Sequence, residues 1–271
     1  MNQPHRLYIF TGKGGVGKST LSKAFTRYLL EHDHEVVYLT FQNQSLGEIH
    51  KGSSDKLVNG IRELSLDLED SARNYIEKKL NSKLIAGWIV KTPFFRALIN
   101  MVPGFNYLIY LGKILDMQNE NPRLIVVLDA PASGHALTMV ESTTNFKQIF
   151  ESGIIFEDTG KMLSRLNNPD YTKIHVITLP SLMAWQEAVE LKVGLSERTP
   201  VTIDITVNNC LYPLLEKDLA NLPLGLKQKT INEKQLVEEN RSQMLCVLEH
   251  SLKQDPMAIE TDLVGSLSKL I

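Results

Sequence analysis

Cysteine is scarce in this sequence, since only Cys210 and Cys246 occur among its 271 residues and neither belongs to a C-x-x-C pair. Two isolated cysteines exclude a disulfide framework and a zinc site built on paired thiols. A chain with so few thiols is typical of a reducing compartment.

Long apolar runs and an excess of positive charge are also missing. No uninterrupted apolar run reaches the roughly 20 residues that a membrane-spanning helix needs. The first six residues contain no apolar core of a signal peptide. The formal charge of −2 and the pI of about 6.4 argue against a broad basic surface for nucleic acid. With 43% hydrophobic residues a sizeable core is expected, so the sequence indicates a cytoplasmic globular protein that meets membranes only through a partner.

Short apolar runs alternate with helical periodicity along most of the chain. The expected strands lie at 7–10, 35–40, 123–128, 175–179, 201–207 and 257–259, and the expected helices at 21–29, 136–150, 181–195 and 234–252. Strand–helix–strand units at this spacing predict a parallel sheet. The predicted fold class is therefore α/β, with a doubly wound, mostly parallel sheet flanked by helices, in a single domain over residues 1–271.

The segment 57–121 differs from the rest because it shows no convincing strand pattern. A polar helical pattern at 64–79 gives way to an apolar stretch at 84–117. Pro93 and the pair Pro103-Gly104 divide that stretch into short helices. We therefore predict a helical insert at about 57–121.

A glycine-rich turn follows the first expected strand. It fits the P-loop pattern G-x-x-x-x-G-K-[ST], and it lies between a strand and a helix, as a P-loop requires. Glycines let successive backbone N–H groups converge on a phosphate, and the following helix adds the positive end of its dipole. We expect Lys18 to bind the β- and γ-phosphates of ATP and the Ser19 hydroxyl to ligate Mg²⁺. The residues expected to contact the nucleotide are Gly12, Lys13, Gly14, Gly15, Val16, Gly17, Lys18, Ser19 and Thr20.

A second motif is an apolar strand that ends in an acid. The run Leu124–Leu128 precedes Asp129, and the chain continues to His135 as Ala-Pro-Ala-Ser-Gly-His. Such a strand is weak evidence alone, but with a P-loop in the same chain it reads as a Walker B arrangement. Asp129 is then expected near the magnesium shell, acting through water.

The two motifs together resemble a known family. The spacing G-K-G-G-V-G-K-[ST], with Lys13 directly after the first glycine, resembles the deviant Walker A group of P-loop ATPases. The run from Asp129 to His135 looks like the switch segment of the arsenical-pump-driving, or anion-transporting, ATPase family, which includes the ATPase that targets tail-anchored membrane proteins. This resemblance covers most of residues 6–210 in scattered motifs.

The resemblance implies functions for particular residues. It implies ATP hydrolysis that drives a conformational switch, in a homodimer or in a heterodimer with a related ATPase, where Lys13 reaches the partner's nucleotide. Asn208, which ends a later expected strand, would contact adenine, because an amide can donate to and accept from a base edge. The alternative for Asn208 is a turn residue at a strand end. Leu179-Pro180, Met183 and Glu187 also match the family's pattern.

The sequence departs from that family after the second expected strand. The family has S-T-D-P-A there, with an Asp placed to polarise the attacking water, whereas this chain has Phe41 at the Asp position. A phenyl ring cannot accept a proton, and loss of a positioned base typically costs about 10²–10⁴ in rate. Gln42 or Gln44 is an alternative for orienting the water, as a glutamine does in some GTPases. A second subunit with an intact switch is another.

Three functions remain open on the sequence alone. The first is an ATP-driven switch of the anion-transporting ATPase family with a protein or hydrophobic, membrane-protein client, which the apolar segment 84–117 favours. The second is a non-hydrolysing regulatory partner of a related ATPase, which Phe41 favours. The third is a partition or septum-site positioning ATPase, which would need a basic DNA-binding face or a basic membrane helix. The terminal segment 262–271 has a single Lys269, so we expect it to pack onto the domain.

Overall fold

The computed structural model describes residues 3–42, 52–149 and 154–271. Within them the strands form an eight-stranded sheet in the order β3-β4-β2-β5-β1-β6-β7-β8. Every pair of neighbours is parallel except β3 and β4. The strands are β1 (Leu7–Thr11), β2 (Val36–Phe41), β3 (Ser54–Val58), β4 (Ile61–Leu66), β5 (Ile125–Asp129), β6 (Thr172–Thr178), β7 (Ile203–Cys210) and β8 (Met244–Glu249).

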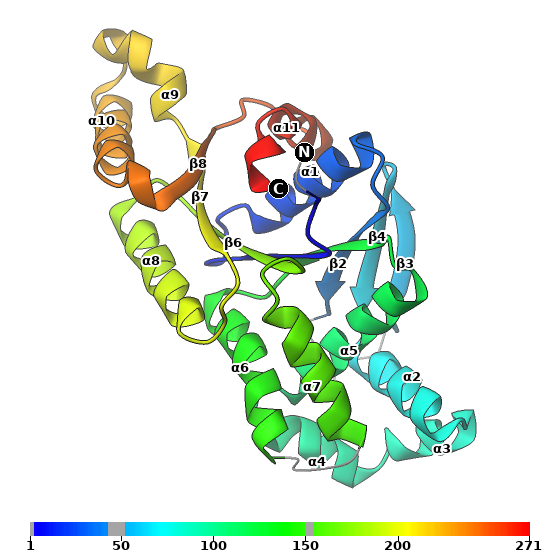
Figure 1. The fold of residues 1–271 in the computed structure, drawn as a ribbon. Helices are drawn as coiled ribbons and strands as arrows, with labels where there is room; N and C mark the ends of the chain where they lie inside the picture. Colours follow the sequence, from blue (N-terminus) through cyan, green and yellow to red (C-terminus); the bar gives the residue numbers. More distant parts are fainter. Residues whose placement is uncertain (1–2, 43–51, 150–153) are drawn as a thin grey trace.

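Helices cover both faces of this sheet (Figure 1). One face carries α1 (Lys18–Glu31), α11 (Pro256–Val264) and the 3₁₀ turn η3 (Leu267–Leu270). The helices of the other layer and the ends are α2 (Leu68–Leu80), α3 (Lys83–Ile89), α4 (Pro93–Met101), α5 (Phe105–Glu120), α6 (Ser133–Ile149), α7 (Ile154–Leu166), α8 (Leu182–Ser196), α9 (Tyr212–Leu215) and α10 (Leu224–Glu239), with the 3₁₀ turns η1 (Glu216–Asn221) and η2 (Arg241–Gln243). This is the predicted α/β fold class, and the sheet topology is that of a P-loop NTPase.

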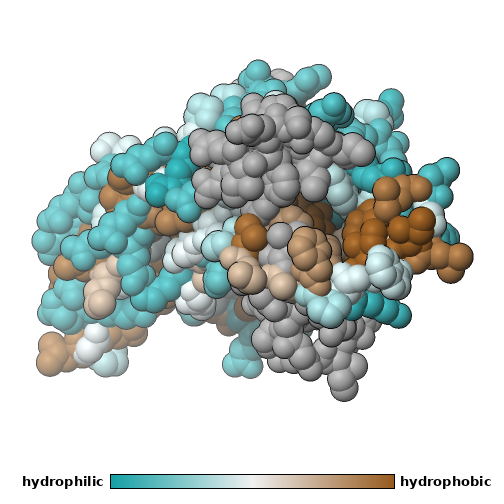
Figure 2. All heavy atoms as spheres, turned by 90° about the horizontal axis from the view of Figure 1, so that it is seen from below, coloured by the Kyte–Doolittle hydropathy of each residue, from teal (hydrophilic) through white to brown (hydrophobic). Residues whose placement is uncertain are grey.

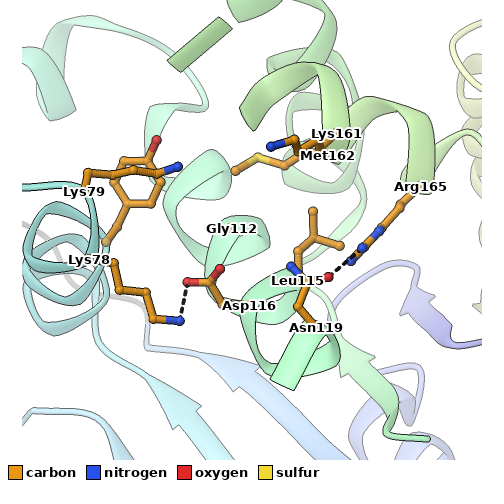
Figure 3. A pocket seen from close by; sticks show the side chains of 10 residues that line it. Lys78, Lys79, Gly112, Leu115, Asp116, Asn119, Lys161, Met162 and Arg165 are labelled. Atoms are coloured by element: carbon orange, nitrogen blue, oxygen red, sulfur yellow. Dashed lines mark hydrogen bonds and ion pairs between the residues drawn. The ribbon is translucent and has the colours of Figure 1, made fainter. Parts of the chain in front are cut away.

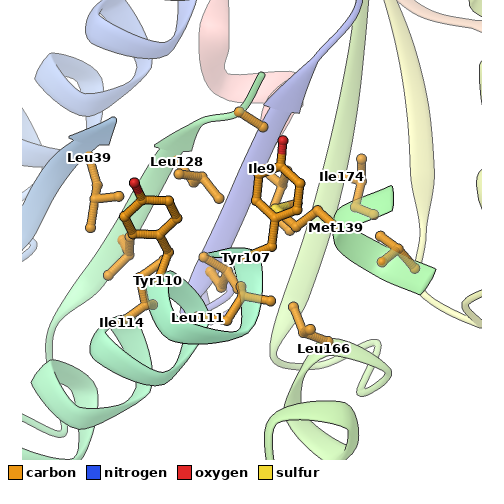
Figure 4. Close-up of a cluster of buried hydrophobic side chains, with 14 of the residues drawn as sticks. Ile9, Leu39, Tyr107, Tyr110, Leu111, Ile114, Leu128, Met139, Leu166 and Ile174 are labelled. Carbon is orange, nitrogen blue, oxygen red and sulfur yellow. The ribbon is translucent and has the colours of Figure 1, made fainter. Parts of the chain in front are cut away.

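The helix α5 carries the core on the second face of the sheet. Its apolar residues, including Leu111 and Ile114, pack on the sheet side chains Ile9, Leu39 and Leu128 (Figure 4). Ten residues of α5 are buried, more than the narrow apolar stripe of an amphipathic surface helix would hold. The helix therefore joins the sheet to the outer helices α2, α4 and α7, whose residues Ala72, Phe95 and Met162 belong to the same core cluster.

The prediction that segment 57–121 contains no strand is wrong. The strands β3 and β4 form an antiparallel hairpin, and β4 pairs in parallel with β2. The turn between them is Asn59-Gly60, and both residues have positive φ, 49° and 81°. Asn-Gly is the strongest short signal for a two-residue hairpin turn. The helix predicted from residue 64 begins at Leu68 instead, because the Asp67 carboxylate accepts a hydrogen bond from the Asp70 N–H and caps it.

The division of the remaining insert at its prolines and glycine is confirmed, although α5, with 16 residues, is not short. The helices α3, α4 and α5 are separate, and Pro93 is the first residue of α4. Gly104, with φ 81°, precedes α5. A side chain there would meet the Cβ of Ser142 at 2.6 Å, so the break between α4 and α5 depends on this glycine.

Two predictions near the C-terminus are also wrong. The segment 234–252 is the end of α10, the turn η2 and the strand β8 rather than one helix. The segment 257–259 belongs to α11, whose start is set by Pro256 and by the Asp255 side chain accepting from the Ala258 N–H. The packing of the terminal segment is confirmed, since Leu263, Leu267 and Leu270 are buried against α1 and the sheet. None of the helices in the described ranges is both long and apolar enough to cross a membrane.

Candidate nucleotide-binding site

The glycine-rich turn connects the carboxyl end of β1 to the start of α1. Gly12, Gly15 and Gly17 have φ of 137°, 81° and 89°. A Cβ on Gly12 would lie 2.2 Å from the Ile177 carbonyl oxygen, and one on Gly17 would lie 2.4 Å from the Asn208 Nδ2. Both backbone conformation and space thus require glycine at these positions, which is the construction of a loop that presents N–H groups to an anion.

Lys18 begins α1 and turns back over the loop. Its Nζ donates to the Lys13 carbonyl oxygen at 3.0 Å. The side chain is half-buried, and burial lowers the pKa of Lys18, an effect that nearby Asp129 partly offsets. A phosphate at the loop would supply negative charge that favours the ammonium form, so this lysine fits a phosphate-binding position.

Ser19 and Asp129 are adjacent at the ends of α1 and β5. The Ser19 Oγ donates to the Asp129 Oδ2 at 2.5 Å, and the Tyr38 hydroxyl donates to the same oxygen at 2.9 Å. Burial, followed by the charge of Asp129, raises the pKa of Tyr38, so its hydroxyl stays a donor. The site places a carboxylate and a hydroxyl side by side, and Mg²⁺ prefers such oxygen ligands.

Tyr38 was not among the residues expected at the site. It lies in the buried strand β2, two residues before Thr40, which pairs with Asp129. Lys23 lies 5.0 Å from the centroid of its ring and forms an ion pair with Glu63 of β4 at 2.6 Å. A tyrosine in a buried strand needs a hydrogen-bond partner for its hydroxyl. This requirement is the feature of the sequence from which a role for Tyr38 at the site could have been predicted.

Lys13 projects from the loop on the side of α8. Its Nζ lies 2.6 Å from the Glu187 Oε1, and both side chains are largely exposed. Exposed ion pairs contribute only about 0–1 kcal/mol. Lys13 can therefore exchange Glu187 for another anion at small cost.

Asn208 lies beneath the loop at the end of β7 and is buried. Its Nδ2 donates to the Val16 carbonyl oxygen at 3.0 Å, which holds the loop in place. The neighbouring Asn209 lines a 370 Å³ pocket with Pro180, Leu211 and His250. A Cβ on Gly17 would lie 3.9 Å from the Asn209 Nδ2, so this pocket begins directly beside the loop.

The strand β2 ends in a different environment. The Phe41 ring stacks on Tyr110 of α5, with centroids 4.3 Å apart and planes at 9°. Gln42 follows, and its Nε2 donates to the Gly52 carbonyl oxygen at 2.8 Å. Both residues line a 600 Å³ pocket together with Pro131 and His135 from the segment after β5. Gln44, the other glutamine considered for orienting water, lies outside the described residues.

A P-loop after the first strand and an acid at the end of the neighbouring parallel strand define this molecule as a P-loop nucleotide-binding protein. Comparison with known families narrows the class. The family model described as anion-transporting ATPase matches residues 5–190, more than half of the chain. The chain belongs to the anion-transporting ATPase family.

Individual relatives are distant. The ATPase BagA of Mycobacterium tuberculosis is 22% identical over 238 residues, which cover 81% of this chain and 70% of the relative. An ATPase ASNA1 homolog of Cryptosporidium parvum is 26% identical over 197 residues, covering 69% of this chain and 52% of the relative. The putative arsenical pump-driving ATPase 2 of Aquifex aeolicus is 24% identical over 174 residues, covering 60% of this chain and 57% of the relative.

Proposed function

We propose that the chain acts as a single domain, a dimeric ATP-binding switch that couples nucleotide state to a protein or hydrophobic client and hydrolyses ATP slowly. Membership of the anion-transporting ATPase family supports nucleotide binding. The observation that carries the proposal is the juxtaposition of the glycine loop, Lys18 and the Ser19–Asp129 pair at one edge of the sheet.

Each group at this edge has a defined task. Lys18 and the N–H groups of residues 12–20 bind the phosphates. The Ser19 hydroxyl would hold Mg²⁺, and the Asp129 carboxylate, oriented by Tyr38, would stabilise the charge of that ion. When bound, ATP supplies the phosphoanhydride bond whose hydrolysis resets the switch. The pocket beside Asn209 receives the base, with Asn208 supporting both the loop and the adenine edge.

Dimerisation rests on Lys13 and on the family resemblance. In the single chain Lys13 is held by Glu187 through an exposed contact. Release of that contact lets the lysine reach the nucleotide of a second subunit, either a copy of this chain or a related ATPase. The weak ion pair makes this exchange inexpensive.

A hydrophobic client is supported by the outer helices. Apolar side chains of α3 and α4, namely Leu84, Trp88, Phe94 and Met101, are 70–88% exposed. Figure 2 shows apolar atoms gathered at the end of the molecule where α3 lies. Exposed apolar clusters of this kind are typical of interaction sites.

A second candidate function is that of a non-hydrolysing regulatory partner. Phe41 favours it, because its ring is stacked on Tyr110 and offers no proton acceptor where the family places an Asp.

For the hydrolysing function, Gln42 is the residue proposed to orient water in place of that Asp. Its side-chain amide donates to Gly52, and it lines the pocket that also contains His135.

Equilibrium binding of ATP with Mg²⁺ tests the proposal. The unchanged protein is expected to bind, and Lys18→Ala to bind roughly 100-fold more weakly, because charge-assisted hydrogen bonds to two phosphates are lost. Lys56→Ala, at an exposed position on the edge strand β3, which β4, β2 and β5 separate from β1, is the matched control and should bind normally. Equal affinity of the Lys18 variant and the control would contradict the proposal.

A further inference from the structure

A second cavity system lies away from the nucleotide site, between the outer helices. One part is an apolar cavity of 250 Å³ between α2, α4, α5 and α7, lined by residues that include Ile76, Phe95 and Leu108. It is partly open to solvent, because Phe94, which lines it, is 77% exposed. Apolar pockets are typical binding sites for the apolar parts of ligands.

The other part is a cleft of 170 Å³ between α2, α5 and α7 with a basic rim. Four cations line it, namely Lys78, Lys79, Lys161 and Arg165, against a single lining carboxylate, Asp116. Figure 3 shows these side chains arranged around Gly112 at the floor of the cleft. The rim therefore carries a net positive charge that an anionic group would complement.

The contacts of these cations show which of them are not neutralised by a carboxylate. Lys78 is neutralised, because it forms ion pairs with Asp116 at 3.1 Å and with Glu120 at 2.7 Å. Arg165 donates to the neutral amide oxygen of Asn119 at 2.6 Å. Lys161 is exposed and forms no ion pair with any described residue. Arg165 and Lys161 thus remain available for an anion.

The apolar cavity and the basic cleft are neighbours. Tyr75 and Met162 line both. A Cβ on Gly112 would lie 2.9 Å from the Met162 Cε and 4.0 Å from the Tyr75 Cδ2. The partition is therefore the end of a methionine side chain above a glycine, and methionine adapts its shape readily. Together the two cavities fall within the roughly 300–1,000 Å³ of small-ligand sites.

We infer that these joined cavities bind a single-chain anionic amphiphile, a medium-chain fatty acid, with the carboxylate at Lys161 and Arg165 and the acyl chain passing Met162 into the apolar cavity. An all-apolar ligand would not use the basic rim. A small anion such as phosphate would not use the apolar cavity. An occupant of both parts carries an anionic head and an apolar tail. The site is distinct from the nucleotide site, and binding requires no ATP.

Fluorescence titration with 11-(dansylamino)undecanoic acid tests this inference on the full chain without nucleotide. Dodecanoic acid and the uncharged 1-dodecanol then serve as competitors. We expect one saturable site that dodecanoic acid displaces. Decanoic acid should bind about 15-fold more weakly than dodecanoic acid, since each buried methylene changes affinity about fourfold.

Three variants distinguish the contribution of the carboxylate head to binding from that of the acyl tail. Lys161→Glu should weaken dodecanoic acid by roughly three- to tenfold and leave 1-dodecanol within twofold. Phe94→Asp, at a cavity-lining side chain that is 77% exposed, should weaken both competitors without unfolding the protein. Lys253→Glu, at an exposed lysine elsewhere, should change neither.

Several results would overturn the inference. They are the absence of saturable binding, the same loss for acid and alcohol in Lys161→Glu, and an equal loss in Lys253→Glu. Displacement of the probe by an apolar helical peptide but not by dodecanoic acid would also overturn it, and would assign the cavities to a peptide instead. Loss of ATP binding in Lys18→Ala has no bearing on these outcomes.

Discussion

The ends of β5 and β2 lie side by side in the sheet, yet they have opposite chemistry. At the end of β5, Asp129 receives hydrogen bonds from Ser19 and Tyr38 and lies near Lys18. At the end of β2, Phe41 stacks on Tyr110 and belongs to the apolar contact between the sheet and α5. The first end has the groups that bind a phosphate and its metal. The second has an aromatic ring at the position where the family resemblance places a carboxylate.

The difference separates binding from hydrolysis. Nucleotide affinity depends on the loop and on the oxygen ligands, which are all present. Hydrolysis depends also on a group that positions or polarises water, and the family resemblance places that group at Phe41. In place of a proton acceptor, the ring of Phe41 provides a direct contact to the helical layer. The first two predictions each change one of the two ends.

The largest expected effect comes from restoring the acid. Phe41→Asp should raise ATP turnover about 100-fold, the lower end of what a positioned base supplies. Phe41→Leu is the control, because it removes the ring stack with Tyr110 without adding a proton acceptor, and its turnover should stay low. Steady-state phosphate release under saturating Mg-ATP measures both. An equal rise in the two variants would mean that the ring hinders hydrolysis rather than that the acid is missing.

The next effect concerns the metal. Asp129→Asn should lower the apparent affinity for Mg²⁺ in the presence of ATP by roughly 10–100-fold, as changes to groups behind the metal ligands typically do. The amide keeps the size of the carboxylate but loses its charge. Magnesium titration of nucleotide binding checks this, with Asp218→Asn on an exposed turn as the control. Unchanged magnesium dependence would remove Asp129 from the proposed site.

A smaller effect is the pH dependence of the free energy of unfolding, which arises from a buried histidine. His175 is fully buried beside Tyr8 and Phe10, and its Nε2–H donates to the Leu270 carbonyl oxygen. Burial lowers its pKa from 6.5 to about 3. As the pH falls, His175 takes up a proton in the unfolded chain before it does so in the folded protein. The stability of the folded protein relative to the unfolded chain is therefore greatest above about pH 6.5 and is lost as the pH falls toward 3. At pH 5 the loss is about 2 kcal/mol.

Urea unfolding at pH 7 and pH 5 measures this loss. His175→Gln keeps an N–H donor for Leu270 but cannot titrate, so its free energy of unfolding should fall by distinctly less between the two pH values. His34→Gln, at a partly exposed position, should behave like the unchanged protein. Identical pH dependence in His175→Gln and the unchanged protein would contradict the assignment.

Much of the nucleotide side was predictable from the sequence. The P-loop pattern, the apolar strand before Asp129 and the alternation of strands and helices are local signals, and the structure brings Ser19 and Asp129 into contact. Local patterns succeed here because every parallel strand ends at the same edge of the sheet. The position of Phe41 could also be predicted, because it ends the second strand of the chain.

The errors arose where tertiary context or turn chemistry decides. The hairpin of β3 and β4 was missed although Asn59-Gly60 marks it, because β3 is largely exposed and has little apolar alternation. In β8, buried residues alternate with more exposed ones over only six positions. This strand pattern is too short to be distinguished from the helical pattern that precedes it. The contacts of Lys13 with Glu187 and of Tyr38 with Asp129 join segments far apart in sequence. No local pattern encodes such pairs.

Single-turnover hydrolysis of ATP by the unchanged protein tests the central claim most directly. Protein in excess over radiolabelled ATP is mixed with Mg²⁺, and bound ATP and released phosphate are followed on the same samples. We expect ATP to bind fully and to be hydrolysed at roughly 0.1–0.001 per second, which is 10²–10⁴ below a typical enzymatic rate of about 10 per second. Complete binding followed by hydrolysis at 1 per second or faster would contradict the account, because it would show that Phe41 leaves the catalytic machinery intact.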